Sequence, residues 1–476
     1  MEGAVRIYGN HTATLDTNSS SGGNGQAVET YYPTHLGADQ LHINGVYGTG
    51  VTVAVLDSGA LGEGMGGLKH NISGSNRVLA HYDPVTDHLL EGNSLPEDDF
   101  GHGTHVASIA VSSRQTGTGS FNGMAPNADL VVVQAFDATG SSSYADVIRG
   151  IDWIVTNKDT YGIRVLNCSF SAAPQSYYWD DPLNQAVMEA WRSGIVVVAS
   201  AGNRGPSAMT IGVPGNVPYI VMVGAMTDNY TPQDMSDDIL ASFSSAGPTV
   251  EGFVKPEIVA PGGHVKAVMK DTAQIALDHP EFHNGGYYFN MSGTSQATAF
   301  VSGIVALMLQ QSPQLTPDEV KYRLMDTARP AVYGLGNGSL TYSVFQQGAG
   351  LVNAYDAANS LATGTANNGL DIDADLAGTQ HFQGPANAYV SGHGKKASKV
   401  YYVTDGNGNL LGDGFLWSDT YFEASGFLWS DGFLWSDGFL WSDGFLWSDG
   451  FLWSDGFLWS DLTTEALFTE SWIPQE

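Results

Sequence analysis

The chain has little cysteine, little positive charge and no long apolar run. Cys168 is the only cysteine among 476 residues, which excludes an intrachain disulfide. It lies in the apolar run 163–170, where a buried structural thiol is expected rather than a reactive one. No uncharged apolar stretch reaches the roughly 18 residues that a membrane-spanning helix needs. Because no disulfide can form, the fold must be stabilised by its core or by bound ions.

Positive charge is scarce, with 18 Lys and Arg against 49 Asp and Glu and a formal net charge of -31. This balance argues against nucleic acid or an anionic membrane surface as a main partner, because both would repel the protein. It is typical of a secreted, extracellular protein, and salt would screen the self-repulsion. The first residues, 1–8, lack the basic and apolar regions of a signal peptide.

Short runs rich in Val and Ile alternate with segments of helical spacing. Strands buried on both faces that alternate with helices predict an α/β fold, a mainly parallel sheet with helices on both faces. Ligands of such sheets bind beyond the carboxyl ends of the strands, and both Asp57 and Asn203 closely follow apolar runs. The expected strands are 51–56, 128–136, 165–170, 195–201 and 219–225, and the expected helices are 145–156, 182–193 and 297–311.

Three short motifs, far apart in the chain, supply an acid, a base and a nucleophile. Asp57 follows the apolar run Val-Ala-Val-Leu and precedes Ser-Gly, His102 begins the segment His-Gly-Thr-His, and Ser295 ends Ser-Gly-Thr-Ser. A serine hydroxyl becomes a nucleophile when an adjacent base takes its proton, and an acid orients that base. The order Asp, His, Ser is one of the known chain orders of this constellation.

In these motifs the chain resembles the subtilisin-like serine proteases (subtilases, peptidase family S8), over about residues 32–361. The resemblance implies a subtilisin-like fold and peptide hydrolysis through an acyl-enzyme. It implies that Ser295 is the nucleophile, His102 the general base and Asp57 its partner. The family commonly has Met directly after this serine and Pro four residues after it, where this chain has Gln296 and Ala299.

Each of these residues also has a plainer interpretation. Ser295 could be an ordinary helix N-cap, and Asp57 a turn or cap residue after a strand. His105 competes with His102 for the role of base, although the resemblance implies that the first histidine is catalytic. The resemblance also implies that the side chain of Asn203 stabilises the oxyanion, with a simple turn as the alternative.

The resemblance further implies that the substrate binds as an extended strand between two edges of the protein. The usual pattern at the second edge is Ser-Leu-Gly, where this chain has Ser-Phe-Ser. Phe170 would keep the pocket wall apolar, and neither edge contains Asp or Glu. We therefore expect cleavage after large apolar or aromatic residues. The expected substrate-binding residues are Gly140, Ser141, Ser142, Ser169, Phe170 and Ser171.

The proposed chemistry requires no cofactor or metal. Calcium commonly stabilises subtilases, and loops such as Asp83–Asp99 offer oxygen ligands, but no spacing identifies a calcium site. We expect protein or peptide substrates, a monomer, and a secreted bacterial or archaeal enzyme.

Composition divides the chain into five parts. Residues 4–16 are similar to the tail of a subtilase propeptide, and 17–26 predict a flexible connector where processing could occur. The expected divisions are 1–31, propeptide remnant and connector; 32–362, peptidase domain; 363–413, linker or small accessory module; 414–461, repeats; and 462–476, acidic tail.

The hexapeptide Gly-Phe-Leu-Trp-Ser-Asp occurs at 414–419 and in six uninterrupted copies over 426–461. A period of six is a multiple of two, so a strand would place every Phe, Trp and Asp on one face. One unit cannot bury its own aromatic rings, but stacked units can. We expect a repetitive β region that packs on the protein or binds a polymer or surface. A scaffold acting through these repeats, with weak or no protease activity, is the alternative function.

Overall fold

The computed structural model describes residues 12–15, 18–19, 30–60, 67–91, 98–232, 234–283, 287–332, 340–391, 398–404 and 410–412. Its central feature is a 9-stranded sheet in the order β12-β11-β10-β8-β3-β6-β4-β5, with β13 also paired to β11. All pairs within it are parallel except those made by β5 and β12. The strands are β3 (Thr52–Asp57), β4 (Val78–Asp83), β5 (His88–Glu91), β6 (Asp129–Gln134), β8 (Ile163–Cys168), β10 (Val196–Ser200), β11 (Val221–Thr227), β12 (Ile239–Leu240) and β13 (Ile258–Pro261).

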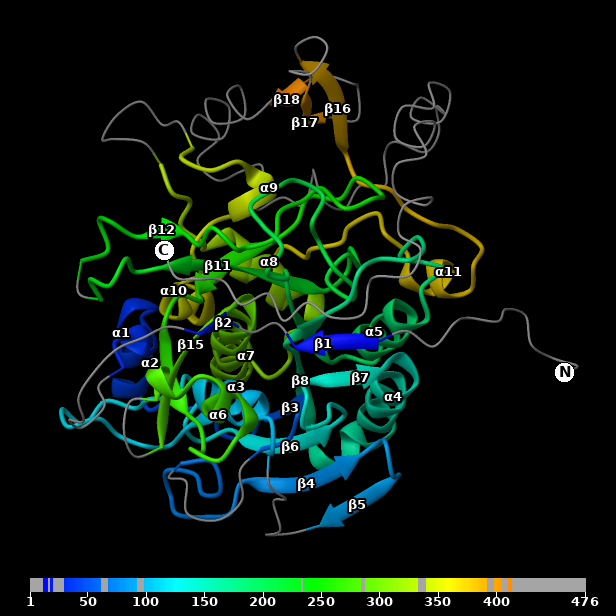
Figure 1. The fold of residues 1–476 in the computed structure, drawn as a ribbon. Coiled ribbons are helices and arrows are strands. Elements are labelled where there is room, and N and C mark those ends of the chain that lie inside the picture. Colours follow the sequence, from blue (N-terminus) through cyan, green and yellow to red (C-terminus); the bar gives the residue numbers. More distant parts are fainter. Residues whose placement is uncertain are drawn as a thin grey trace, which may run out of the picture.

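Helices cover both faces of this sheet (Figure 1). α3 (His102–Val111) and α7 (Thr294–Gln311) pack against each other and lie on one face, and α4 (Tyr144–Tyr161) and α5 (Pro182–Arg192) lie on the other. Close approach of α3 and α7 requires a small residue, because a Cβ on Gly303 would lie 2.8 Å from the Ala110 carbonyl oxygen. The other helices are α1 (Tyr32–His35), α2 (Ala38–Ile43), α6 (Gln274–Asp278), η1 (Pro280–Phe282), α8 (Pro317–Asp326), α9 (Val344–Gln347), α10 (Ala354–Asn359) and α11 (Ile372–Leu376).

The predicted parallel α/β architecture is confirmed. Each of the five expected strands overlaps an observed one, and the strands β3, β10 and β11 are buried along their whole length. The expected helix over 145–156 extends to Tyr161, where Gly162 ends it with a left-handed φ of 65°. The expected helix over 297–311 begins earlier, at Thr294, so Ser295 lies in its first turn.

The sheet edge near β13 contains a buried ionic cluster. Glu257 accepts hydrogen bonds from Lys255 Nζ at 2.5 Å and from the Met222 backbone N–H at 2.8 Å, and its Oε1 lies 2.9 Å from Lys321 Nζ. All three charged side chains are at most 1% exposed. One carboxylate thus neutralises part of the charge of two buried ammonium groups and fixes α8 against the sheet.

Beyond α10 the chain continues with further regular elements. Asp375 of α11 accepts hydrogen bonds from the hydroxyls of Tyr178 and Tyr219, so the segment lies against the sheet domain. A separate antiparallel sheet follows, made of β16 (Ala386–Ser391), β17 (Ser398–Thr404) and β18 (Leu410–Gly412). The hexapeptide repeats and the acidic tail lie outside the described residues.

Two small sheets involve the start of the chain. β1 (Thr12–Leu15) lies between β7 (Ser141–Ser143) and β9 (Phe170–Ser171), antiparallel to both. β2 (Asn18–Ser19) pairs with the end of β15 (Tyr288–Ser292), which itself pairs with β14 (Val265–Val268).

Candidate active site

Asp57 and His102 are in direct contact at the carboxyl end of β3. Nδ1 of His102 lies 2.8 Å from one carboxylate oxygen of Asp57 and 3.0 Å from the other, and both side chains are fully buried. Burial raises the pKa of Asp57, and the neighbouring His102 opposes that shift. Nδ1 therefore carries the proton that Asp57 accepts, and this leaves the opposite ring nitrogen, Nε2, as a base.

The close fit between the start of α3 and the end of β3 sets this contact. A Cβ on Gly103 would lie 2.1 Å from the Gly59 carbonyl oxygen, so only glycine allows the two segments to approach. The Gly103 N–H donates to the Ser58 hydroxyl at 2.9 Å. The glycine after His102 in the sequence motif thus brings the imidazole to the carboxylate.

Asp98 is a positioning residue that the sequence motifs did not identify. Its carboxylate accepts hydrogen bonds from the backbone N–H groups of Gly101 (2.8 Å) and Thr104 (2.7 Å), and so caps the start of α3. It also accepts a hydrogen bond from the Ser58 hydroxyl at 2.9 Å. One side chain therefore fixes both the helix that carries His102 and the residue that follows Asp57. The only sign of this role in the sequence is that an acidic residue stands four positions before His102.

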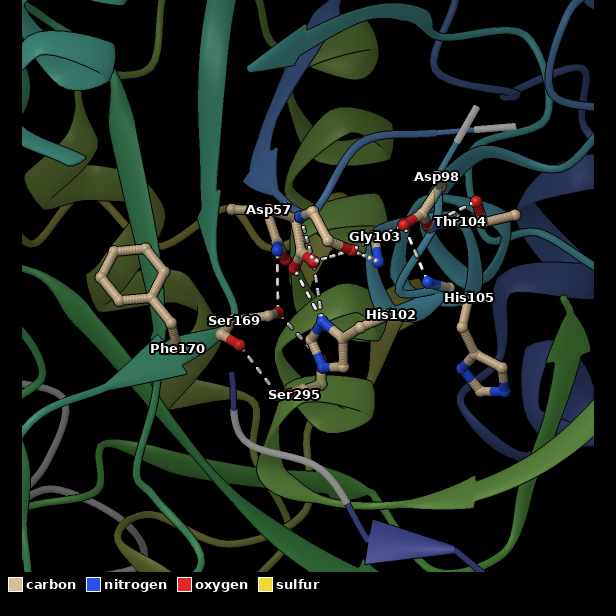
Figure 2. A network of polar contacts seen from close by, with 12 residues as sticks. Asp57, Asp98, His102, Gly103, Thr104, His105, Ser169, Phe170 and Ser295 are labelled. Carbon is tan, nitrogen blue, oxygen red and sulfur yellow. Dashed lines mark hydrogen bonds and ion pairs between the residues drawn. The ribbon is translucent and has the colours of Figure 1, made fainter. Parts of the chain in front are cut away.

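His105, the competing histidine, is buried in a different environment. Its Nε2 donates to the Phe289 carbonyl at 3.1 Å, and burial lowers its pKa to about 3. It therefore stays neutral at physiological pH and joins α3 to β15. In Figure 2 its ring lies apart from Asp57, whereas the ring of His102 lies between Asp57 and Ser295.

Ser295 is the second residue of α7. Its hydroxyl donates to the Ser169 carbonyl at 3.0 Å, and the Ser169 hydroxyl donates back to the Ser295 carbonyl at 3.1 Å. Asn167 and Ser302 extend this network, since Ser302 donates to Asn167 and Asn167 donates to Ser169. Because N–H groups of a first helical turn lack intrahelical acceptors, the backbone at Ser295 favours negative charge.

Asn203 lies beside Ser295 with its amide group fixed in one orientation. Its Oδ1 accepts hydrogen bonds from the backbone N–H and the hydroxyl of Thr294, both at 3.0 Å. Its Nδ2 is buried and has no hydrogen-bond partner. A buried amide N–H₂ without an acceptor is costly, so a site that holds one is suited to an incoming oxygen atom.

The predicted substrate edges flank a strand of the protein itself. In β1, Thr12, Ala13 and Thr14 pair with Ser143, Ser142 and Ser141, and on the other side Thr14 and Leu15 pair with Ser171 and Phe170. Gly140 precedes the first edge with a left-handed φ of 72°, and a Cβ there would lie 2.4 Å from the Phe100 ring. All six expected substrate-binding residues therefore lie at this pair of edges or beside Ser295.

Phe170 contributes its backbone to this arrangement rather than its ring. The ring packs on Phe136 with centroids 5.2 Å apart and is fully buried. Figure 2 shows it pointing away from Ser295. The apolar pocket wall expected from this side chain is therefore not provided next to the nucleophile.

Two further expectations from the sequence concern the Cys168 thiol and a metal site. Cys168 is buried, and burial raises the pKa of its thiol, so it is not poised for reaction. Over the part of the chain that the structure describes, no cluster of three or more His, Cys, Asp or Glu side chains suits a metal ion. In the loop proposed to offer calcium ligands, the Asp83 carboxylate accepts hydrogen bonds from the backbone N–H groups of Val85 and Thr86 and from the Thr86 hydroxyl.

No described helix is both long and apolar enough to cross a membrane.

Comparison with known proteins agrees with this geometry. Residues 48–370 match the model of the subtilase family, Peptidase_S8. The chain belongs to the subtilase family. This subtilase is 39% identical over 300 residues to serine protease AprX of Bacillus subtilis, covering 61% of the present chain and 65% of AprX. It is 32% identical over 324 residues to subtilisin DY of Bacillus licheniformis, covering 67% of the chain and 95% of that protein.

A solved structure shows the same fold. The crystal structure of fervidolysin from Fervidobacterium pennivorans, described as a keratinolytic enzyme related to subtilisin, matches with a TM-score of 0.56 and 24% identity. The match covers 83% of this chain and 57% of fervidolysin. The subtilase thus spans somewhat less than two thirds of both AprX and fervidolysin.

Proposed function

We propose that this subtilase is a serine endopeptidase that hydrolyses peptide bonds through an acyl-enzyme on Ser295. The observation that carries the proposal is the position of β1, a stretch of polypeptide held as an antiparallel strand between β7 and β9 and leading towards Ser295. An extended peptide that binds by main-chain pairing to two edges is the geometry of β-augmentation. This pairing supports peptide binding between β7 and β9, beside the proposed nucleophile, base and oxyanion donor.

In the proposed reaction the Ser295 oxygen attacks the carbonyl carbon of the bound peptide while His102 accepts the hydroxyl proton. Asp57 stabilises the imidazolium that results. Asn203 Nδ2 and the Ser295 backbone N–H donate to the carbonyl oxygen as it becomes negative. His102 then gives its proton to the leaving amine, the C–N bond breaks, and water hydrolyses the acyl-enzyme by the reverse proton path.

The pairing of β1 and β2 supports an expectation of where the chain first cleaves itself. In β1, Thr14 pairs with Ser171 and Leu15 with Phe170, and the next residue along that edge, Ser169, accepts a hydrogen bond from the Ser295 hydroxyl. In β2, Asn18 pairs with Ser292, three residues before Ser295. We therefore expect the first cleavage between Leu15 and Asn18, at the start of the connector where composition also predicts processing.

We also expect large apolar or aromatic residues before the scissile bond to be cleaved readily. The Phe170 ring does not explain this preference, because it packs in the core. The preference rests instead on the absence of Asp and Glu from both edges, since no carboxylate there can bind a basic side chain. Comparable cleavage after Arg and Phe in a peptide library would contradict this expectation.

The acidic composition supports secretion into an extracellular medium, and protein or peptide substrates are the expected partners of a monomer. Structural calcium stays a prediction without an assigned site. EDTA treatment followed by thermal unfolding tests it, and an unchanged melting temperature would contradict it.

The role of the hexapeptide repeats stays a separate proposal. They either pack on the protein or attach it to a polymer or surface, and the scaffold alternative assigns the whole function to them. Deleting 414–461 separates these proposals. Lost solubility or thermal stability indicates packing, whereas retained hydrolysis with lost adhesion indicates attachment. Adhesion without hydrolysis by the full chain would favour the scaffold.

The direct test of the endopeptidase proposal compares the full chain with Ser295→Ala. Mass spectrometry of the wild-type chain should show loss of the N-terminal segment and a new N-terminus between residues 16 and 18, together with casein hydrolysis. Ser295→Ala should remain uncut. A folded wild-type chain that neither trims itself nor hydrolyses casein would contradict the proposal.

A further inference from the structure

A cavity of about 410 Å³ lies at the edge of the central sheet, where Met226 of β11 pairs with Leu240 of β12. Its walls come from the ends of β11 to β13, from the loop that leads into β12, and from residues between 329 and 351. Its described lining residues include none of the proposed catalytic residues. A volume of this size is typical of pockets that hold small organic molecules.

Most of the cavity wall is apolar. Met226 and Val259 are 6% and 5% exposed and form its inner part. Met235 and Ile239 are 42% and 38% exposed, so they stand at its opening to solvent. Methionine side chains are flexible and polarizable, and they adapt to ligands of irregular shape. The apolar lining residues are Met226, Met235, Ile239, Leu240, Val259 and Leu351.

Asp238 places an unpaired carboxylate in this apolar wall. Its Oδ1 is buried and has no hydrogen bond in the part of the chain that the structure describes. Burial raises the pKa of Asp238 to about 6, and the neighbouring charges of Asp228, Asp237 and Asp234 add to that shift. The carboxylate is therefore ionised at pH 8, where a buried charge without a partner is costly.

Two other polar side chains of the wall are already paired. The exposed guanidinium of Arg329 lies 2.9 Å from Asp356, and no ion pair joins it to Asp238 among the described contacts. The Tyr342 hydroxyl accepts a hydrogen bond from the Leu240 N–H at 3.1 Å. Asp238 is thus the acidic group of the wall that is available to an incoming molecule.

We propose that this cavity binds a small organic ammonium compound, with its cationic nitrogen at Asp238 and its apolar body against Met226, Val259 and Leu351. The four neighbouring carboxylates repel an anion. A bare metal ion does not fit, because the described residues contain no cluster of three or more His, Cys, Asp or Glu that suits one. The inference goes beyond the endopeptidase function and does not rest on it.

The experiment uses the full chain with Ser295→Ala, which prevents self-digestion, at pH 8 and about 0.15 M salt to screen general attraction of cations. The methyl groups of its 12 methionines are labelled with carbon-13 and followed by NMR. Phenethylamine is the probe. The methyl signals of Met226 and Met235, assigned through Met226→Leu and Met235→Leu, should shift and saturate. The signal of Met124, which is buried elsewhere, should not move.

Two further probes separate charge from shape. Phenylacetate has the same ring with the opposite charge, and methylammonium has the charge without the ring. Each should bind at least about tenfold more weakly than phenethylamine, because each loses one of the two contacts. Equal affinity for phenethylamine and phenylacetate, or tighter binding of phenylacetate, would overturn the inference. So would an absence of saturable shifts at Met226 and Met235. These comparisons require no substitution at the site.

Asp238→Asn tests the carboxylate itself. The amide keeps its size, and the variant should bind phenethylamine at least about tenfold more weakly while it stays folded, because an unpaired buried charge is removed. Asp152→Asn, which removes an exposed carboxylate from α4, is the matched control for net charge and should bind as its parent does. Equal binding by Asp238→Asn and Asp152→Asn would overturn the assignment of Asp238 and leave the endopeptidase proposal untouched.

Discussion

The side-chain oxygen of Asn203 accepts two hydrogen bonds from Thr294, the residue immediately before Ser295. This contact fixes the amide so that Nδ2 is the atom left for the substrate. We predict that Asn203→Ala lowers kcat by about 10² to 10³ with little change in KM, because the lost donor acts on the transition state. Steady-state kinetics with a peptide that carries Phe before the cleaved bond measures both constants.

Thr294 provides the matched control. Thr294→Ser keeps both donors to Asn203 and should retain kcat within a few fold. Thr294→Val removes only the hydroxyl and should lower kcat about tenfold, the effect of one hydrogen bond. A value of kcat in Asn203→Ala close to that of the wild type would show that the oxyanion is stabilised elsewhere.

Asp57→Asn is predicted to abolish most activity without unfolding the protein. The amide keeps the volume of the carboxylate but can present a donor to His102, which favours the wrong tautomer and lowers kcat by about 10⁴. The urea unfolding midpoint should stay close to that of wild type, because burial already disfavours the ionised carboxylate. A drop in kcat of less than tenfold would contradict the role given to Asp57.

Glu251 is predicted to make stability depend on pH. One carboxylate oxygen accepts from the Tyr178 N–H at 2.7 Å, the other has no hydrogen bond, and burial raises the pKa to about 7. A raised pKa means that folding favours the protonated form. Its contribution is complete below the ordinary pKa of about 4.5 and is lost as the pH rises through 7.

The test compares Glu251→Gln with its parent, both in a Ser295→Ala background that prevents self-digestion. Between pH 4.5 and pH 8 the variant should gain about 3 kcal/mol in free energy of unfolding relative to the parent. Urea titrations at both pH values measure this. A difference between the two proteins that is the same at every pH would contradict the prediction.

Glu257→Gln is predicted to destabilise the fold strongly. It leaves the ammonium groups of Lys255 and Lys321 buried without a carboxylate, which costs about 3 to 5 kcal/mol in free energy of unfolding. Breaking the exposed pair of Arg329 and Asp356 by Asp356→Asn should cost less than about 1 kcal/mol. Urea unfolding measures both losses in free energy. Equal losses would show that charge pairing in the buried cluster stabilises the fold no more than an exposed ion pair does.

The fold elements predicted correctly from the sequence are those with a local signal. Runs of Val and Ile marked the strands of the sheet, because a strand buried on both faces must be apolar along its length. Asp57 and Asn203 were selected because they follow such runs, where parallel sheets place their ligand sites, and their catalytic roles stay predictions. The glycines around His102 formed part of a motif, and the structure shows the close approach that requires one of them.

Other features depend on tertiary contacts that leave no local pattern. Asp98 caps α3 from a loop with no regular spacing. Phe170 was expected to keep the pocket wall apolar, but its ring packs on the ring of Phe136 in the core. β1 has only four residues and no apolar run marks it in the sequence, so its pairing with two edges, rather than a local pattern, makes it a strand.

The most direct test of the central claim is labelling of the purified, folded chain with a serine-directed phosphonylating reagent, followed by mass spectrometry. The account predicts one phosphonyl group per chain, located on Ser295, with loss of peptide hydrolysis in the same proportion. His102→Ala should lose most of the labelling rate, because the hydroxyl then lacks its base. Labelling spread over several serines, or none on Ser295 in a chain shown to be folded, would contradict the account.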